Sequence, residues 1–226
     1  MLNKSKEKPI LILMSKWPAP KRCKSRLEKE IGSFRAAYIQ QKLTIHTIEV
    51  AKELERKGLL EFKVSVAGIG PKLAKRWGKR IGVKAISTQG LGNLGNRLKK
   101  EVLNSQNKKN YFSHKIKKSI IIIGTDLPTL CELDLFEAIN TLNTNELVIG
   151  PSYDGGYWLI GLSSKLISPF NKLPFDGIKW GTKTVFSETI RKIETTGIKY
   201  ELLKYKNDLD HLGDLLPWQI LKQFPS

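Results

Sequence analysis

An aspartate stands directly after an unbroken apolar run of the sequence. Ile120–Ile123 are four consecutive isoleucines, and Gly124, Thr125, Asp126 and Pro128 follow them. β-Branched residues without polar alternation predict a strand that is buried on both faces. Ligands of open α/β sheets bind just beyond the carboxyl ends of the strands. A carboxylate there is costly unless it is solvated, paired or bound to a metal, so Asp126 is the first candidate site residue. A turn aspartate that caps local backbone groups is the alternative.

A loop crowded with cations follows a predicted first strand, Ile10–Met14. Pro18 and Pro20 hold this loop extended, and a helix start comes after it. Neighbouring cations repel one another unless an anion lies among them, and a helix N-terminus favours phosphate. The pattern predicts a phosphate site with Pro18 beside the cations, and a solvated basic loop is the alternative. The loop lacks the glycines of a Walker loop. Its cations are Lys16, Lys21, Arg22, Lys24 and Arg26.

Two further segments contain glycines where a ligand could approach the backbone. In the first, Gln89 could read the amide edge of a base beside Gly90, and Arg97 would lie in the next helix; a plain strand-to-helix connection is equally consistent. In the second, Asp154, Gly155 and Gly156 form a tight turn, which an ordinary hairpin explains without a ligand. Aromatic residues near this turn leave room for stacking on a base or a sugar. They are Tyr157, Trp158 and, as a lid or a core residue, Trp180.

An acidic segment near the end of this basic chain contains Asp208, Asp210 and Asp214. Alternating carboxylates of an extended segment point the same way, and hard divalent cations prefer oxygen ligands. Asp208 and Asp210 are therefore candidate metal ligands, whereas Asp214 suits the first turn of a last helix. An acceptor hydroxyl would need a general base, and Asp154 or Asp210 could serve.

Strands and helices alternate along the chain, which predicts an α/β fold. Thr129 and Glu132 fit a capping box at the start of one helix, and Asn104–Lys118 is polar enough for a surface loop. The predicted strands are Ile10–Met14, Phe62–Ala67, Val83–Ile86, Ile120–Ile123, Leu147–Gly150, Tyr157–Leu162 and Ile198–Leu203. The predicted helices are Phe34–Lys57, Pro71–Arg80, Thr129–Leu142 and Thr184–Thr195.

The composition predicts one domain over residues 9–226 after a disordered basic start over residues 1–8, because 226 residues that are 40% hydrophobic can form a substantial core. No run approaches the roughly 20 apolar residues of a membrane span, and none is a convincing signal peptide. The two cysteines, Cys23 and Cys131, form no disulfide framework, so a cytoplasmic location is expected. The net charge of +18 suggests nucleic acid, but the scattered cations and the lack of a binding motif make a non-catalytic nucleic-acid-binding protein the least favoured reading.

Five segments in this order resemble the bacterial glycosyltransferase-like family of the nucleotide-diphospho-sugar transferase (GT-A) superfamily. Some members of that family are assigned to arsenosugar biosynthesis, and more distant relatives are nucleotidyltransferases of molybdenum and deazaflavin cofactor synthesis. The resemblance covers about residues 10–216. The segments are Lys16–Leu27, Gln89–Leu98, Gly124–Leu130, Gly150–Leu162 and Asp208–Leu215.

The resemblance implies a three-layer α/β/α Rossmann-like GT-A fold, with a mostly parallel central sheet and helices on both faces. It implies a metal-dependent glycosyltransferase that moves a sugar from a nucleotide-diphospho-sugar donor to a small-molecule acceptor; a nucleotidyltransferase of the cofactor-guanylyltransferase type, which releases pyrophosphate, is the alternative. The donor base, the sugar, the acceptor and the oligomeric state are left open. Asp126 would bind Mg²⁺ or Mn²⁺, and Asp208 and Asp210 would complete the metal site or orient the acceptor. The implied nucleotide-binding residues are Lys16, Pro18, Lys24, Arg26, Gln89, Gly90, Arg97 and Thr125, and the implied acceptor-binding residues are Gly155, Gly156, Tyr157 and Trp180.

Overall fold

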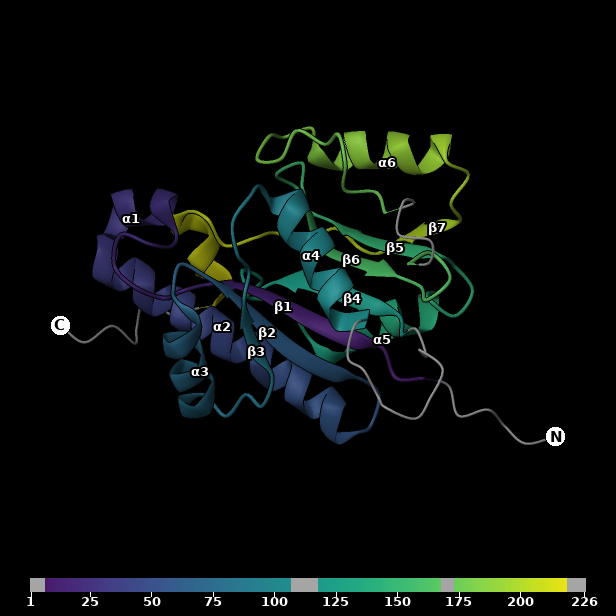
Figure 1. Cartoon of the computed structure of the whole chain (residues 1–226). Helices are drawn as coiled ribbons and strands as arrows, with labels where there is room; N and C mark the ends of the chain where they lie inside the picture. The colour runs from purple at the N-terminus through teal and green to yellow at the C-terminus, as the bar shows by residue number, and fades with distance from the viewer. Residues whose placement is uncertain (1–6, 107–117, 168–172, 219–226) are drawn as a thin grey trace.

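A single mixed sheet of seven strands organises the computed structural model, which describes residues 7–106, 118–167 and 173–218 (Figure 1). The strand order is β3-β2-β1-β4-β6-β5-β7, and among these strands β6 runs antiparallel to its two neighbours while the other pairs are parallel. The strands are β1 (Ile10–Lys16), β2 (Glu61–Ala67), β3 (Ile86–Thr88), β4 (Ile120–Gly124), β5 (Leu147–Pro151), β6 (Tyr157–Leu162) and β7 (Tyr200–Leu202).

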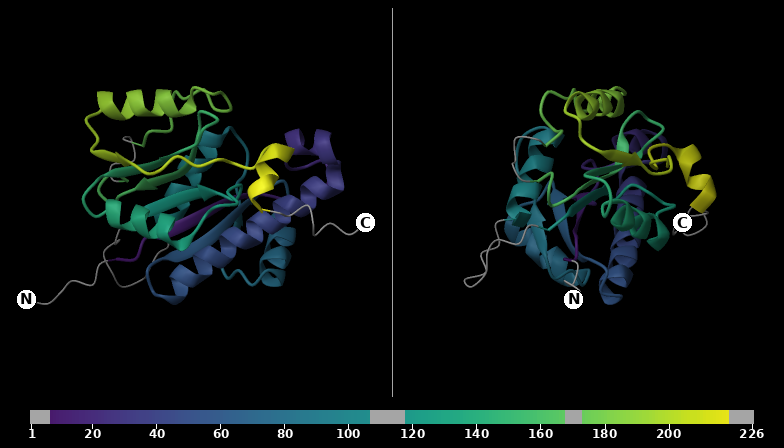
Figure 2. Two further views of the ribbon diagram at one scale, coloured as in Figure 1. Left: turned by 180° about the vertical axis from the view of Figure 1, so that it is seen from behind. Right: turned by 90° about the vertical axis from the view of Figure 1, so that its right-hand side faces the viewer.

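Helices cover both faces of this sheet, so the predicted three-layer α/β/α fold with a mostly parallel sheet is confirmed. Alternate side chains of a strand point to opposite faces. Leu11 and Leu13 of β1 pack on the face covered by α2, α3 and α5, whereas Ile12 packs on the face covered by α4 and α6. Figure 2 shows α6 and α2 on opposite sides of the molecule. The helices are α1 (Ser25–Ile31), α2 (Ser33–Arg56), α3 (Pro71–Arg80), α4 (Leu94–Gln106), α5 (Glu132–Thr141), α6 (Val185–Thr195) and the 3-10 helix η2 (Leu212–Trp218).

Two strands differ in their bounds from the predictions: β3 begins later than predicted, and β7 is shorter than predicted. The strand predicted at Val83–Ile86 begins only at Ile86, because the Val83 N–H donates to the Gly78 oxygen and closes α3. The strand predicted at Ile198–Leu203 is reduced to Tyr200–Leu202, because the Ile198 N–H likewise closes α6 by donating to the Ile193 oxygen. In both places the first apolar residue caps a helix rather than joining the sheet.

The predicted capping box of Thr129 and Glu132 is wrong. Cys131 is the N-cap of α5, and its N–H donates to Asp134 Oδ2 at 2.8 Å. Glu132 instead pairs with Lys57 at the end of α2. The sequence predicts a helix start after the basic loop but gives no bounds for it. The structure has the short helix α1 there, and its first residues, Ser25 and Arg26, still belong to the cation-rich stretch.

Some sequence predictions fall partly outside the described residues. These are the disordered start, of which only Glu7 and Lys8 are described, and the surface loop Asn104–Lys118, whose first residues instead belong to α4. Within the described ranges, no helix is long and apolar enough to cross a membrane.

A small apolar cluster fixes the acidic segment to the start of the fold. It is separate from the two main cores and joins α1 and α2 to the stretch around η2. Burial of these side chains holds residues 208–215 against the basic loop, although more than 180 residues separate them in the sequence. The cluster consists of Leu27, Ile39, Leu43, Leu209 and Leu215.

Candidate active site

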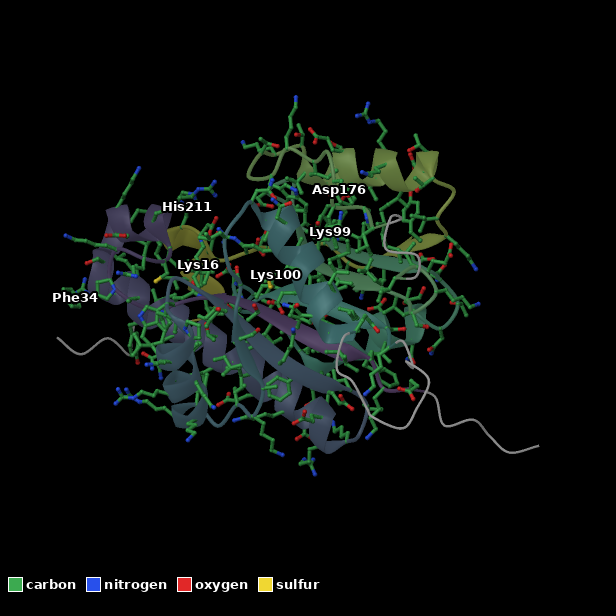
Figure 3. The ribbon with its side chains drawn as sticks, viewed as in Figure 1. Lys16, Phe34, Lys99, Lys100, Asp176 and His211 are labelled. Atoms are coloured by element: carbon green, nitrogen blue, oxygen red, sulfur yellow. The ribbon has the colours of Figure 1, made fainter. Side chains whose placement is uncertain are left out.

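The carboxyl ends of β1, β2 and β4 meet at one edge of the sheet, because these strands are parallel. Met14 pairs with Gly124, and Lys16 pairs with Ala67. β6 is antiparallel, so its first residue, Tyr157, lies at the same edge as the end of β5. Figure 3 shows Lys16 at this end of β1. The basic loop, the turn after β4 and the β5–β6 hairpin therefore converge at this edge, as the sequence predicts for a site.

Lys24 is a buried residue at the centre of this site. Its side chain is 3% exposed, and Nζ lies 2.7 Å from Asp126 Oδ1 and 3.6 Å from Asp210 Oδ1. The ammonium also donates to the Leu209 oxygen at 2.6 Å. Lys24 joins the two acidic segments, and a phosphate would reach its ammonium only beside these carboxylates. Its backbone has a φ of 50°, a left-handed conformation that is strained for a lysine.

The other predicted phosphate ligands of the basic loop lie at the surface. Arg26 is 62% exposed and places Nη1 2.8 Å from Asp210 Oδ2. Lys16 is exposed, and Pro18 is half-buried. Arg22 donates from Nη1 to the Gly68 oxygen at 2.9 Å, which ties the loop to the end of β2. Exposed guanidinium and ammonium groups can meet an incoming anion without first leaving a buried partner.

These charges shift one another's pKa values. Burial alone would raise the pKa of Asp126, but the Lys24 ammonium, with help from Lys16 and Gln40, outweighs it and holds that pKa below its ordinary value. Burial would lower the pKa of Lys24, yet the nearby carboxylates raise it. For Asp208, burial and repulsion by Asp126 and Asp154 raise the pKa to about 7. Asp208 is therefore the carboxylate whose charge is least balanced by the protein.

The carboxylates fit a divalent cation that is shared with a substrate, rather than one enclosed by the protein. In the described part of the chain, no group of three or more His, Cys, Asp or Glu side chains is arranged to hold a metal. Mg²⁺, however, is commonly held by one or two carboxylates together with substrate phosphates. Asp126 and Asp208 offer such oxygens, and a cation would relieve the repulsion on Asp208. Asp210 is less available, because Lys24 and Arg26 already pair with it.

A cavity of about 260 Å³ opens beside these carboxylates on the α4 side of the sheet. Its wall brings together six of the predicted site residues, including two cations and two carboxylates. A second hollow of about 620 Å³ continues along the same edge past β2 and is lined by Trp17, Arg22, Leu73 and Gly90, among others. The six site residues of the first cavity are Lys16, Gln89, Arg97, Asp126, Tyr157 and Asp208.

The glycine-rich loop before α4 is held in place by its own polar side chains. Gln89 is buried, and its Nε2 donates to the Ser15 and Ser65 oxygens at 3.0 and 2.9 Å, which leaves the amide oxygen for a ligand. Arg97 Nε donates to the Gly92 oxygen at 2.9 Å. Gly90 has a φ of 80°, and a Cβ there would lie 2.6 Å from Lys100 Nζ. The base-reading role of Gln89 stays a prediction.

The β5–β6 hairpin has the tight turn that the sequence predicts. Asp154 is exposed, and its Oδ1 accepts the Gly156 N–H at 2.9 Å. Gly155 has a φ of 89°, and a Cβ there would lie 2.1 Å from the Lys183 oxygen, so only glycine fits. Trp180 is half-buried and packs edge-on against Tyr157 at 6.2 Å. Of these residues, Tyr157 lines the cavity and Asp154 lies close enough to Asp208 to raise its pKa.

A buried polar network lies below the turn after β4, and no sequence pattern used above predicts it. Gln40 Nε2 lies 3.2 Å from Thr125 Oγ1, and Thr44 Oγ1 lies 3.4 Å from the same atom and 3.2 Å from Ser15 Oγ. Thr125 was predicted to bind nucleotide, and its hydroxyl faces α2 instead. The missed signal is the polar spacing of Gln40, Thr44 and Thr47 on the buried face of a helix.

The raised pKa of Asp208 predicts an unusual pH dependence for the metal-free protein. The folded state keeps this proton up to about pH 7, whereas the unfolded chain releases it near pH 3.9. The folded state therefore binds more protons between these values, and the contribution of Asp208 to stability falls as the pH rises. Asp208→Asn should raise the free energy of unfolding at pH 8 by about 1–2 kcal/mol, since solvent screens a half-buried carboxylate.

Urea unfolding of both proteins in EDTA at pH 4, 6 and 8 measures this difference. It should be absent at pH 4, where Asp208 is protonated in the wild type. A constant difference at all three pH values would show that the substitution acts through packing and not through charge.

The profile of the family described as "Uncharacterized protein conserved in bacteria (DUF2064)" matches residues 50–182. A search of curated proteins gives no match. Among solved structures, a proposed nucleotide-diphospho-sugar transferase from Desulfovibrio desulfuricans G20 is 22% identical with a TM-score of 0.76, and the match covers 96% of this chain and 89% of that one.

Two more distant structures share the fold. The 4-diphosphocytidyl-2C-methyl-D-erythritol synthase of Anaerococcus prevotii DSM 20548 has a TM-score of 0.56 at 13% identity, with coverage of 96% and 99% of the two chains. The glucosyl-3-phosphoglycerate synthase of Mycobacterium tuberculosis, in complex with Mn²⁺, UDP and phosphoglyceric acid, has a TM-score of 0.54 at 12% identity, with coverage of 91% and 70%. At these identities the likeness shows the fold alone.

Proposed function

The chain belongs to the DUF2064 family, and from its site we propose that it is a metal-dependent glycosyltransferase that uses a nucleotide-diphospho-sugar donor. One observation carries this proposal: Lys24, Asp126, Asp208 and Asp210 form a charged cluster beside a cavity at the carboxyl edge of the sheet. Exposed cations of the basic loop flank this cluster. Such an edge suits a diphosphate that is neutralised partly by protein cations and partly by a metal.

Each of the two hollows suits a different part of the nucleotide-sugar donor. The larger one, with Trp17 and Leu73 in its wall, offers apolar surface for a nucleoside. The smaller one, which is lined by Lys16, Arg97 and two carboxylates, suits the diphosphate and its sugar. Asp126 and Asp208 would hold Mg²⁺ or Mn²⁺, which when bound neutralises phosphate charge.

In the proposed reaction, an acceptor hydroxyl oxygen forms a bond to the anomeric carbon of the sugar. The bond from that carbon to the diphosphate oxygen breaks, and the nucleoside diphosphate leaves with the electron pair. Lys16 and Arg97, which line the smaller hollow, stabilise the leaving phosphates, which is an electrostatic contribution. The hydroxyl proton passes to a carboxylate. We favour Asp154, because Asp210 is committed to two cations.

Thermal unfolding against a panel of nucleoside diphosphates and triphosphates, with and without Mg²⁺ or Mn²⁺, tests this function. A ligand at 100 times its dissociation constant should add about 2.7 kcal/mol. For a chain of this size the unfolding midpoint should rise by roughly 5–10 °C. We expect a metal-dependent rise with one nucleoside diphosphate.

A rise that is confined to one triphosphate, with release of pyrophosphate, would instead identify a nucleotidyltransferase. No rise with any nucleotide would contradict both assignments. Asp176→Asn, at an exposed ion pair with Lys99, is the matched control and should respond as the wild type does (Figure 3).

A further inference from the structure

Three aromatic side chains form a partly exposed cluster at the site edge of the sheet. The rings of Tyr153 and Tyr205 lie 5.2 Å apart, and the rings of Phe186 and Tyr205 lie 6.2 Å apart. Tyr153 is 70% exposed and Tyr205 is 47% exposed. These rings come from the hairpin turn, the first turn of α6 and the stretch after β7. We call them the aromatic platform.

The backbone fixes the aromatic platform beside the carboxylates. Ser152 and Lys206 form a parallel bridge, which aligns the hairpin with the stretch that leads to Asp208. Asp154 follows Tyr153 in the sequence, and Asp154 and Asp208 each lie two residues beyond this parallel bridge. A molecule lying on the platform would therefore be close to the two stretches that carry these carboxylates.

Lys206, which follows Tyr205 of the platform, is directed to another face. Lys206 pairs with Asp134 at 2.9 Å and lies over the Trp158 ring, on the side of α5. Tyr205 instead packs against Phe186 of α6, on the opposite side from Lys206. The platform thus presents its aromatic rings to an incoming molecule, and Lys206 is directed away from it.

The exposed cations and the aromatic platform lie at different places along this edge of the sheet. Lys16 and Arg22 lie at the ends of β1 and β2, Arg26 reaches the acidic segment and is paired with Asp210, and the platform lies at the ends of β5 and β7. The sheet order puts β4 and β6 between β1 and β5, a separation of three strand spacings or about 14 Å. An anion is favoured at the β1 end, whereas a phosphorylated acceptor on the platform would meet Asp154 and Asp208.

We propose that the aromatic platform of Tyr153, Phe186 and Tyr205 binds the acceptor, and that this acceptor is an uncharged ring compound bearing hydroxyl groups. Aromatic faces stack on the apolar face of such a ring, and Asp154 is placed to accept a hydrogen bond from one of its hydroxyls. This inference rests on the proposed function and names the acceptor class of the same site.

Saturation-transfer NMR with two matched probes tests the assignment. Methyl β-D-glucopyranoside and glucose 6-phosphate share a glucopyranose ring. They differ in the phosphate charge at C6 and in the methyl group on the anomeric oxygen. With Mg²⁺ and the stabilising nucleoside diphosphate present, the wild type should transfer saturation to the glucoside and bind the phosphate less well. Tyr153→Ala and Tyr205→Ala should each weaken glucoside binding by about ten-fold. Tyr153→Phe keeps the ring and should retain binding.

Leu202→Ala, an exposed apolar change in the adjoining β7, is the control and should bind as the wild type does. Unchanged glucoside binding in both alanine variants, or no binding at millimolar concentration, would overturn the platform. Tighter binding of glucose 6-phosphate with the same tyrosine dependence would overturn the uncharged class. The nucleotide-dependent rise in unfolding midpoint is measured separately on every variant, so loss of the proposed function is distinguished from loss of the acceptor site.

Discussion

Asp126→Ala should lower transfer from the proposed nucleotide-sugar donor by at least about 10³-fold, because it removes both the proposed metal ligand and the main partner of Lys24. The metal-dependent rise in unfolding midpoint should disappear with it. The fold should persist, since the strand before Asp126 is held by the buried isoleucines of β4. Release of nucleoside diphosphate and far-ultraviolet circular dichroism measure the two effects.

Two further variants serve as controls for this result, Asp176→Asn and Asp126→Asn. The first neutralises an exposed aspartate far along the chain and should keep full activity. The second keeps the volume at the site and removes the charge, so it should be nearly as inactive as the alanine variant. An Asp126→Ala protein with wild-type turnover would refute the role of this carboxylate, and with it the proposed metal site.

Lys24→Met should lower the free energy of unfolding by about 3 kcal/mol, because it removes the cation that separates two carboxylates. Methionine has a similar volume and the same backbone restriction, so the change isolates the charge. The Leu209 oxygen also loses its ammonium donor. Urea unfolding at pH 7 and low salt is the direct measurement.

Lys16→Met is the matched control for this substitution. Lys16 is an exposed lysine of the same loop, and its replacement should change stability by no more than about 0.5 kcal/mol. Similar unfolding free energies for the two variants would show that the buried ammonium is not required to hold the acidic segment.

Local patterns predicted the elements that position the site. The four isoleucines of β4 predict a strand that is buried on both faces. The helix α3 begins at Pro71 and ends at Arg80, as the sequence predicts. The Asp-Gly-Gly turn also specifies the hairpin between β5 and β6. In each case the signal lies within a few neighbouring residues, where propensity and hydrophobic period are strong.

The partners of the charged residues could not be predicted in this way. In the sequence, nothing distinguishes Lys24 from the other cations of the basic loop. Only the folded chain shows that its ammonium forms ion pairs with Asp126 and Asp210. Gln40 and Thr44 likewise read as tolerated polar residues of a long helix, although they contact Thr125. Such contacts depend on the docking of distant elements, about which local sequence carries little information.

The contact between Lys24 and the Leu209 oxygen joins residues 185 positions apart, and it has a consequence for biosynthesis. A ribosome that adds 5–20 residues per second needs roughly 10–40 seconds to make the later residue after the earlier one. During that interval the nascent chain carries a lysine that cannot yet be buried at low cost, because its carbonyl partner and Asp210 do not exist. The amino-terminal half can collapse around β1, β2 and α2, but the candidate active site is completed only when the acidic segment has left the ribosome. Premature termination before that segment should therefore yield a partly folded, inactive product in which the basic loop stays accessible to proteases.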